Sequence, residues 1–329
     1  MIITVTLNAA IDKTLAVPNF RLGRRHRAIE QRALAGGKGV NVARALKGLG
    51  QPVIATGFAG GPTGTRIIEQ LTEEAILNDF VRIREESRTS TAVVDPASGE
   101  QTEINEYGPQ VSEAELDLFR DKLLYLAKGA GVCVFCGSLP GGAPGSFYAD
   151  LVQALRKLGV TTVLDSEGEA LDLATRAEPT VVTPNEIEAE ELVGHEFADD
   201  DDRLTAVSEI VALGAREAVM TLETGCIALV EDPSAVAHPD SRRRLYRCAL
   251  EPADTPVSAV GSGDAFLAGY VAARYGGRAA EDGLRFAVAC GAESTQHFGA
   301  GVIDVRAVER LAADVAVEAL PEPALEPRG

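Results

Sequence analysis

From about residue 130 onward, short apolar runs alternate with longer stretches in which apolar residues recur at helical spacing. Apolar runs of strand length lie at residues 132–135, 161–164, 180–183 and 218–222, and helical spacing is found at 145–158, 185–192 and 263–275. This alternation is typical of a mostly parallel sheet covered by helices on both faces. We therefore predict a doubly wound α/β core with its ligand crevice at the carboxyl ends of the strands.

Two earlier regions, residues 10–35 and 87–107, differ from this strand-and-helix pattern because polar and apolar residues alternate in them. The alternation predicts antiparallel strands that form a small inserted β-sheet over the crevice, called the lid below. The predicted domains are the core, at residues 1–9, 36–86 and 108–317, and the lid, at 10–35 and 87–107. Residues 318–329 are rich in Pro and Glu, so we predict a disordered tail.

The charge balance argues against one class of partner. The 31 basic and 49 acidic residues give a net charge of −18, so a polyanion would be repelled over most of the exterior. We therefore predict no binding to nucleic acid. Any anionic ligand must be captured by a local cluster of basic residues.

The five cysteines are scattered through apolar runs, which predicts buried thiols in a reducing compartment. Cys133 and Cys136 have the spacing of a redox or metal motif, but strand alternation would place their sulfurs on opposite faces. No apolar run reaches membrane-spanning length, and the first residues resemble a strand instead of a secretion signal. We predict a cytoplasmic protein without a membrane partner.

A glycine-rich turn, Gly261-Ser262-Gly263-Asp264, precedes a predicted apolar helix. Free N–H groups in the first turn of a helix suit a phosphate or a developing negative charge. Asp264 would lie beside these donors, where its carboxylate can accept the proton of a hydroxyl that attacks the γ-phosphorus of ATP. The alternative is an acid at a helix start that only interacts favourably with the helix dipole.

A second glycine-rich segment, Gly36-Gly37-Lys38-Gly39, also precedes a predicted helix. Its spacing matches neither a P-loop nor a dinucleotide fingerprint. The glycines allow a polyol to lie against the backbone, Asn41 offers a donor and an acceptor to sugar hydroxyls, and Lys38 offers a positive charge. The alternative is a tight turn without a ligand.

Two further polar groups follow predicted strands. Asp12 comes after the first strand, and an acid at that place in an α/β fold lies at the crevice, where it can bind two sugar hydroxyls. Asn185 and Glu188 are three residues apart at a helix start, so they share a face and could orient Mg²⁺ beside the triphosphate. The alternatives are a turn-forming Asp12, and a capping box made by Asn185 and Glu188.

Five motifs lie in order at residues 6–12, 36–43, 137–140, 183–188 and 260–266. Together they resemble the ribokinase-like carbohydrate kinases of the phosphofructokinase B type, over a stretch from Ile3 to about Leu311. Residues 4–8, Lys38 and residues 102–109 are most similar to the branch of 1-phosphofructokinases and tagatose-6-phosphate kinases. The resemblance implies an α/β core with a β-sheet lid, whose strands often form a dimer clasp in relatives.

The resemblance also implies a role for each candidate residue. It implies that the substrate is bound by Asp12, Arg25, Arg27, Gly37, Lys38, Asn41, Arg88 and Ser138, of which Arg25, Arg27, Lys38 and Arg88 hold its phosphate. It implies that Mg-ATP is bound by Asn185, Glu188, Thr221, Gly225, Ala259, Gly261, Gly263 and Ala292, with Glu188 serving the metal. Gly261, Ser262, Gly263 and Asp264 form the catalytic turn, and Asp264 is the base. Potassium near residues 290–301 and a homodimer through the lid are further implications.

The chain departs from the family pattern at the nucleotide loop. Glu223 and Cys226 stand where the family usually has glycine, and Thr183 stands where many relatives have lysine. We expect an altered nucleotide site, because Glu223 repels a polyphosphate unless it points to solvent.

We predict an ATP-dependent kinase that phosphorylates a hydroxyl of a hexose phosphate, with fructose 1-phosphate as the favoured substrate. Tagatose 6-phosphate and fructose 6-phosphate are alternatives, since they differ only in the phosphate position or in one stereocentre. A kinase for an unphosphorylated sugar or a nucleoside is a further alternative. Outside the enzymes, Glu223 and Cys226 point to a nucleotide- or sugar-binding regulator, whereas a Rossmann dehydrogenase is least favoured because its fingerprint is absent.

Overall fold

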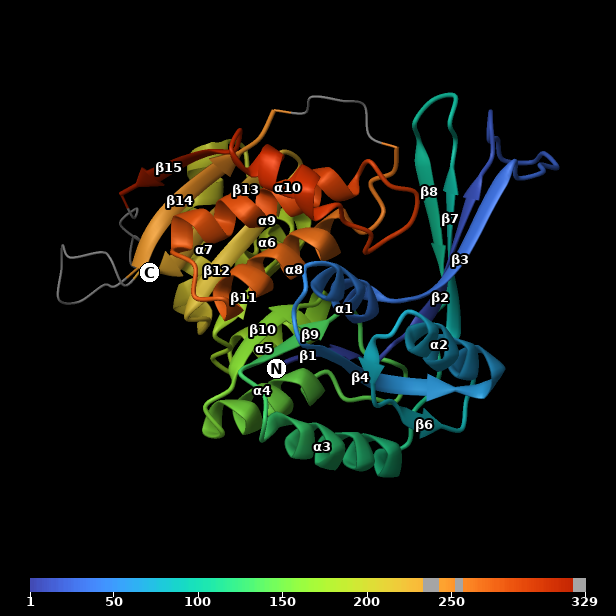
Figure 1. The fold of residues 1–329 in the computed structure, drawn as a ribbon. Coiled ribbons are helices and arrows are strands. Elements are labelled where there is room, and N and C mark those ends of the chain that lie inside the picture. The colour runs from blue at the N-terminus through green and yellow to red at the C-terminus, as the bar shows by residue number, and fades with distance from the viewer. Residues whose placement is uncertain (233–242, 252–256, 322–329) are drawn as a thin grey trace.

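The computed structural model describes residues 1–232, 243–251 and 257–321 of the chain (Figure 1). The helices in these ranges are α1 (Lys38–Gly48), α2 (Gly61–Glu73), α3 (Glu113–Ala127), α4 (Phe147–Lys157), α5 (Gly168–Thr175), α6 (Glu186–Val193), α7 (Asp200–Leu213), α8 (Ser262–Tyr275), α9 (Ala280–Ser294) and α10 (Val305–Ala312). The strands are β1 (Ile2–Thr6), β2 (Ala10–Ala16), β3 (Glu30–Gly36), β4 (Val53–Gly60), β5 (Leu77–Asn78), β6 (Val81–Ile83), β7 (Arg88–Val94), β8 (Gln101–Asn105), β9 (Val132–Cys136), β10 (Thr161–Asp165), β11 (Val181–Val182), β12 (Glu217–Leu222), β13 (Gly225–Glu231), β14 (Arg243–Ala249) and β15 (Ala316–Leu320).

The large sheet has the order β15-β14-β13-β12-β11-β10-β9-β1-β4-β5, and β6 pairs with the last residues of β4. The strands from β12 to β5 are parallel, whereas β13, β14 and β15 continue the sheet in antiparallel pairs. The chain builds outward from β1 through β4 to β5 and then returns to β9 on the other side of β1. The strand order reverses beside β1, so the ligand crevice is expected at the carboxyl ends of β1 and β9.

Helices cover both faces of the large sheet, and each face has its own hydrophobic cluster (Figure 1). Helices α1, α2, α8, α9 and α10 pack with Val134 and Val163 on one face, and α3 to α7 pack with Phe135 and Leu164 on the other. Because successive strand residues point to opposite faces, the buried apolar residues of β9 and β10 contribute to both clusters. The predicted doubly wound α/β core is confirmed.

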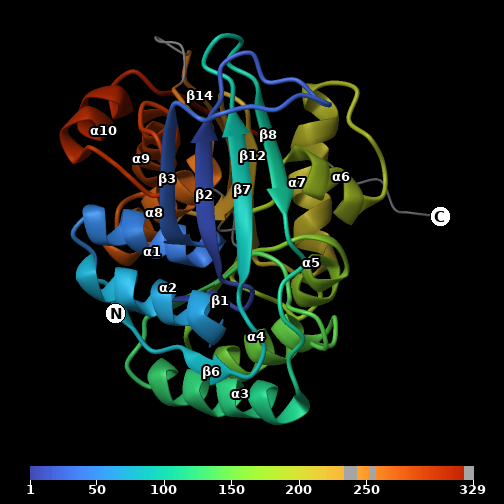
Figure 2. The same cartoon turned by 90° about the vertical axis from the view of Figure 1, so that its right-hand side faces the viewer.

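The lid is a separate sheet with the order β3-β2-β7-β8, seen in front of the core in Figure 2. Its outer pairs are antiparallel as predicted, but the central pair β2–β7 is parallel because two hairpins from distant insertions lie side by side. The register places Asp12 beside Ser90 and Ser90 beside Asn105, so polar side chains share one face. The division of the chain into two domains stays a prediction.

Two predictions about local structure are wrong. Residues 318–320 do not belong to a disordered tail, because β15 pairs with β14 in antiparallel register, with Val317 opposite Cys248. The edge of β14 supplies backbone partners that local composition does not reveal, and residues 322–329 lie outside the described part of the chain. Asp12 does not follow the first strand directly, since β1 ends at Thr6 and Asp12 lies within lid strand β2.

The predictions for the cysteines agree with the structure. All five thiols are free and buried. Cys133 and Cys136 belong to the clusters on opposite faces of the sheet, and burial raises the pKa of both thiols. None of the described helices combines the length and the apolar composition that crossing a bilayer requires.

Candidate active site

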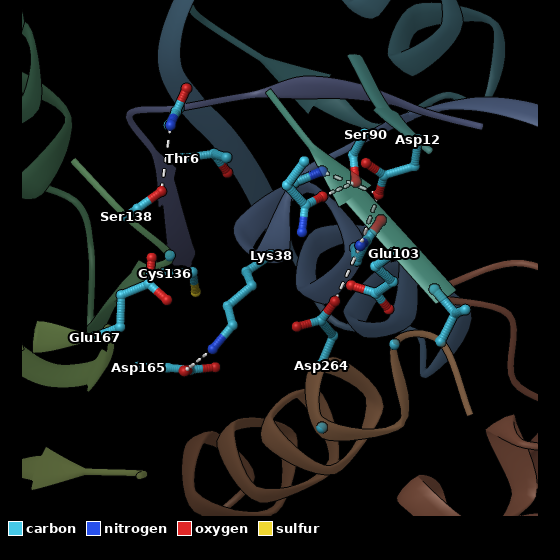
Figure 3. A pocket seen from close by; sticks show the side chains of 18 of the residues that line it. Thr6, Asp12, Lys38, Ser90, Glu103, Cys136, Ser138, Asp165, Glu167 and Asp264 are labelled. Atoms are coloured by element: carbon cyan, nitrogen blue, oxygen red, sulfur yellow. Dashed lines mark hydrogen bonds and ion pairs between the residues drawn. The ribbon is translucent and has the colours of Figure 1, made fainter. Parts of the chain in front are cut away.

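A cavity of about 710 Å³ lies at the carboxyl ends of β1, β9, β10 and β12, between the core and the polar face of the lid (Figure 3). A volume of this size is typical of a small-molecule site. The predicted site residues that line it are Asp12, Gly37, Lys38, Asn41, Arg88, Ser138, Asn185, Glu188, Thr221, Ala259, Gly261, Ser262, Gly263 and Asp264. The fold thus brings segments from the whole length of the chain to one crevice.

The glycine turn before α8 presents unpaired backbone donors. Gly261 is the N-cap residue and has a φ of 78°. A Cβ added there would lie 2.5 Å from the Cβ of Ala300, so the turn requires glycine. Within the described residues, the N–H groups of Gly261, Gly263 and Asp264 have no hydrogen-bond acceptor. Such donors at a helix N-terminus form an anion-binding site.

Asp264 lies in the first turn of α8 and is buried, with 7% of its surface exposed. Its carboxylate faces the cavity, and its Oδ2 accepts a hydrogen bond of 3.0 Å from Asn41 Nδ2. Burial raises the pKa of Asp264 to about 7, although the charge of Lys38 and the bond from Asn41 lower it. A carboxyl group with a pKa near neutrality suits a general base.

Asn41 connects Asp264 to Asp12. The same Nδ2 donates to Asp12 Oδ2 at 3.2 Å, and the backbone N–H of Gly37 donates to that oxygen at 3.2 Å. A Cβ added at Gly36 would lie 2.0 Å from Asp12 Oδ2, so this glycine lets the acid approach the backbone. Burial raises the pKa of Asp12. The segment therefore does more than turn the chain, because it holds an acid at the cavity wall.

Lys38 extends toward two acids on the core side of the cavity. Its Nζ lies 2.7 Å from Asp165 Oδ1 and 3.7 Å from Glu188 Oε1. Burial opposes the charge of Lys38, but Asp165 and Glu188 outweigh burial and raise its pKa. The ammonium is thus held beside the turn that carries Asp264.

Glu188 takes part in two arrangements at once. Its Oε2 accepts from the backbone N–H of Asn185 at 2.9 Å, and the side chain of Asn185 accepts from the N–H of Glu188 at 2.9 Å. This is the capping box that the sequence offered as an alternative, and it is confirmed. The other carboxylate oxygen, Oε1, faces Lys38 in the cavity.

The wall on the lid side is tied to the end of β1. Arg88 donates to the carbonyl of Asn8 at 3.1 Å through Nε, and to the carbonyl of Glu106 at 3.2 Å through Nη1. Asn8 Nδ2 in turn donates to Ser138 Oγ at 3.2 Å and to the carbonyl of Tyr107 at 3.0 Å. Arg88 and Ser138 therefore lie on one continuous polar wall.

Four predicted site residues do not line the cavity. Arg25 and Arg27 are exposed in the loop that joins β2 and β3 at the far end of the lid (Figure 1). Ala292 lies within α9. Gly225 begins β13, where an added Cβ would lie 1.9 Å from the carbonyl oxygen of Cys248, so close strand packing accounts for this glycine.

The departures from the family pattern also have clear positions. Glu223 is exposed at the turn between β12 and β13 and does not line the cavity, and Cys226 is buried in the core. Thr183 lines the cavity, and its hydroxyl donates to the carbonyl of Leu164 at 3.2 Å.

Asp165 and Asn8 are among the cavity residues that the predictions from sequence omit. Asp165 is the last residue of β10, so the rule that an acid at a strand end lies at the crevice would have found it. Asn8 follows β1, and its buried Oδ1 has no hydrogen-bond partner within the described residues. An unpaired buried acceptor beside a cavity is consistent with contact to a ligand.

Comparisons with known proteins agree with this geometry. Residues 5–306 match the model of the pfkB family carbohydrate kinases. The chain is 34% identical over 271 residues to tagatose-6-phosphate kinase of Staphylococcus epidermidis, covering 82% of this chain and 84% of that protein. It is 31% identical over 291 residues to 1-phosphofructokinase of Borreliella burgdorferi, covering 88% and 90%. A structure of phosphofructokinase-2 from Escherichia coli in complex with substrates and products has a TM-score of 0.84 and 28% identity, covering 95% of this chain and 98% of that one.

The fold and the site together define a carbohydrate kinase with ribokinase-like architecture, in which a helix N-terminus and a buried carboxylate meet at the crevice of an α/β sheet. The chain belongs to the pfkB family and is an ATP-dependent sugar phosphate kinase.

Proposed function

We propose that this kinase transfers the γ-phosphoryl group of ATP to a hydroxyl of a hexose phosphate, with fructose 1-phosphate as the favoured acceptor. Tagatose 6-phosphate is the second candidate, because a tagatose-6-phosphate kinase is 34% identical to the chain. The observation that carries the proposal is the pair of hydrogen bonds by which Asn41 connects Asp12 to Asp264. In the proposal Asp12 is the sugar-binding acid and Asp264 is the buried base, which lies beside unpaired N–H groups.

The residues of the core edge have distinct roles in this proposal. Asp12 accepts hydrogen bonds from the acceptor sugar, and Asp264 takes the proton from the attacking hydroxyl. Within the turn from Ala259 to Gly263, the unpaired N–H groups of Gly261 and Gly263 stabilise the negative charge of the group in transfer. Asn185, Thr221 and the surrounding backbone bind the nucleotide.

Magnesium fits the donor set on the core side. The carboxylates of Asp165 and Glu188 converge on one cationic group, the Lys38 ammonium, so this place already favours a positive charge. No three His, Cys, Asp or Glu side chains of the described residues gather into a metal site, so Mg²⁺ would take its other ligands from phosphate and water. When bound, Mg²⁺ neutralises charge on the triphosphate. We also propose that potassium binds near residues 290–301.

The charge of the cavity supports a role for the lid arginines. The acids that line it are Asp12, Glu103, Glu106, Asp165, Glu167, Glu188 and Asp264, whereas the bases are Lys13, Lys38 and Arg88. A dianionic sugar phosphate needs more positive charge than these bases provide. We propose that Arg25 and Arg27 supply it, which requires either a movement of the lid or a second copy of the chain.

A homodimer through the lid is part of the proposal. The lid exposes large apolar side chains, with Leu22 89% exposed, Ile29 71% and Ile104 61%. Leu22 and Ile29 lie between β2 and β3, and Ile104 lies in β8, so the lid offers apolar contacts to another protein surface at both edges of its sheet. Sedimentation of the full chain, compared with an Ile104→Glu variant, tests this, and a monomeric wild type would contradict it.

The substrate is tested with an ATPase-coupled assay of purified protein on fructose 1-phosphate, fructose 6-phosphate, tagatose 6-phosphate and free fructose. We expect the highest kcat/KM with fructose 1-phosphate. Preference for free fructose would contradict the hexose phosphate proposal and leave only the general sugar kinase. ATP and sugar binding without turnover would support a regulator instead.

A further inference from the structure

Arg44 lies one turn after Asn41 on α1, outside the main cavity, and only 10% of its side chain is exposed. All three guanidinium nitrogens make hydrogen bonds. Nε and Nη2 donate to the two carboxylate oxygens of Glu74 at 2.6 and 3.0 Å, and Nη2 also donates to the carbonyl of Ala35 at 2.6 Å. Nη1 donates to Asn41 Oδ1 at 3.1 Å and to the carbonyl of Ala300 at 3.5 Å.

The bond from Arg44 determines which end of the Asn41 amide faces the two acids. With Oδ1 on the guanidinium, Nδ2 is free to donate to Asp12 and to Asp264. If the amide turned over, its NH₂ group would face the N–H of Arg44 and its oxygen would face two carboxylates. Both contacts would be repulsive, so only one orientation is satisfied.

Arg44 also touches the two backbone segments that flank this amide. The carbonyl of Ala35 directly precedes Gly36, against which the carboxylate of Asp12 lies. The carbonyl of Ala300 belongs to the segment that packs against Gly261 of the catalytic turn. A single guanidinium therefore contacts three segments of the site without entering the cavity.

We propose that Arg44 is a positioning residue for phosphoryl transfer, because it holds the Asn41 amide in the one orientation that aligns Asp12 with Asp264. This inference rests on the proposed function, in which Asp12 binds the acceptor sugar and Asp264 accepts its proton. The competing explanation is structural, since the paired carboxylate of Glu74 at the end of α2 could mean that Arg44 only ties α1 to α2.

The main test is Arg44→Lys, which keeps the positive charge near Glu74 but cannot reach all of the acceptors at once. We expect kcat/KM for the hexose phosphate to fall roughly 10- to 100-fold, while KM for ATP changes by less than about threefold. The acidic limb of the pH profile should also move to higher pH, because a freed amide can turn its oxygen toward Asp264 and raise the pKa of that carboxyl. An unaltered kcat/KM and pH profile would overturn the proposal.

Glu74→Gln is the matched control, because it weakens the tie to α2 and leaves the contacts of Arg44 to Asn41 and Ala35. We expect it to change kcat/KM by less than about fivefold. A loss equal to that of Arg44→Lys would favour the structural explanation. If Arg44→Lys does not fold, the double variant Arg44→Gln/Glu74→Gln, which leaves no unpaired charge, replaces it with the same expectation.

A double-mutant cycle shows whether Arg44 acts through Asn41. In an Asn41→Ala background, Arg44→Lys should lower kcat/KM by less than about twofold further, whereas independent roles would give the full loss again. If turnover in that background is too low, the cycle is measured on fructose 1-phosphate and tagatose 6-phosphate binding by calorimetry. A wild type inactive on every sugar phosphate would contradict the proposed function, while an active wild type with an equally active Arg44→Lys would contradict only this inference.

Discussion

The core edge and the far end of the lid hold their charged side chains in different ways. Asp165 and Asp264 on the core edge are buried. Asp165 accepts a hydrogen bond from Lys38, and Asp264 accepts one from Asn41. Arg27 in the lid loop is exposed, and no ion pair to it is found within the described residues. Packing in the core therefore fixes the position of the side chains that we propose to be catalytic. The arginines of the lid loop, in contrast, can contact the substrate only if the lid is suitably placed.

The base of the lid behaves like the core. Asp12 belongs to lid strand β2, but the N–H of Gly37 and the amide of Asn41, both from the start of α1, hold its carboxylate. Arg88 begins β7 and bonds to the backbone after β1. The contrast is thus between buried groups near α1 and exposed groups near the lid loop, and substitutions on each side should differ in kind.

The largest effect is expected on the buried side, from Asp264→Asn. This change keeps the size of the side chain but removes the proton acceptor, so kcat should fall by at least ~10²–10⁴ while nucleotide affinity is retained. Steady-state kinetics and nucleotide titration measure both quantities. Asp199→Asn at the start of α7, where the acid only caps a helix, is the matched control. Near wild-type turnover of Asp264→Asn would remove this residue as the base.

The next effect concerns the substrate's phosphate. Arg88→Ala and Arg27→Ala should each raise KM for the hexose phosphate roughly 10- to 150-fold, because a charge-assisted hydrogen bond contributes about 1.5–3 kcal/mol. KM for ATP should stay nearly constant. Arg24→Ala, from the same loop as Arg27, is the control, with an expected change under about fivefold. If Arg27→Ala behaves like Arg24→Ala, the lid loop does not contact the substrate.

Activity should also depend on pH through Asp264. Its carboxyl must be ionised to accept a proton, and its pKa is raised by burial to about 7, so kcat/KM should fall about tenfold for each pH unit below 7. The pH profile of kcat/KM measures this directly. A profile that is flat between pH 5 and 7 would contradict the assignment.

The same pKa shift has a consequence for stability. Because the pKa of Asp264 is raised above its ordinary value of 3.8, the folded state loses stability as pH rises from about 4 to 7. The difference in the free energy of unfolding between Asp264→Asn and wild type should therefore shift in favour of the variant by on the order of 2 kcal/mol when the pH is raised from 5 to 8. Urea unfolding of both proteins at these two pH values checks the sign.

The smallest effect is expected from Glu188→Gln. Glutamine can keep the capping hydrogen bond but loses the charge that faces Lys38, so the Mg²⁺ concentration for half-maximal rate should rise about 3- to 10-fold with little change in sugar KM. Glu115→Gln, in the capping box of α3, is the control for helix stability. A large drop in melting temperature with unchanged Mg²⁺ dependence would leave Glu188 as a helix cap alone.

Local patterns in the sequence determined the α/β core and most of the candidate site. Apolar runs and helical spacing depend on nearby residues, so β9, β10 and α8 were predictable from composition and periodicity. Glycine turns before helices also have local signatures, which is why Gly37 and Gly261 were found. The wrong assignment of residues 318–320 shows the limit, since strand β15 depends on the distant edge of β14.

Only the tertiary structure decided which of these groups meet. Asn41 and Asp264 are 223 positions apart, and no local pattern shows that one amide joins Asp264 to Asp12 or that Arg44 orients that amide. The structure likewise separated Arg27 from the cavity, although the resemblance had grouped it with Arg88. The physical reason is that side-chain contacts are set by how helices and strands pack across the whole chain, whereas sequence periodicity reports only on each element by itself.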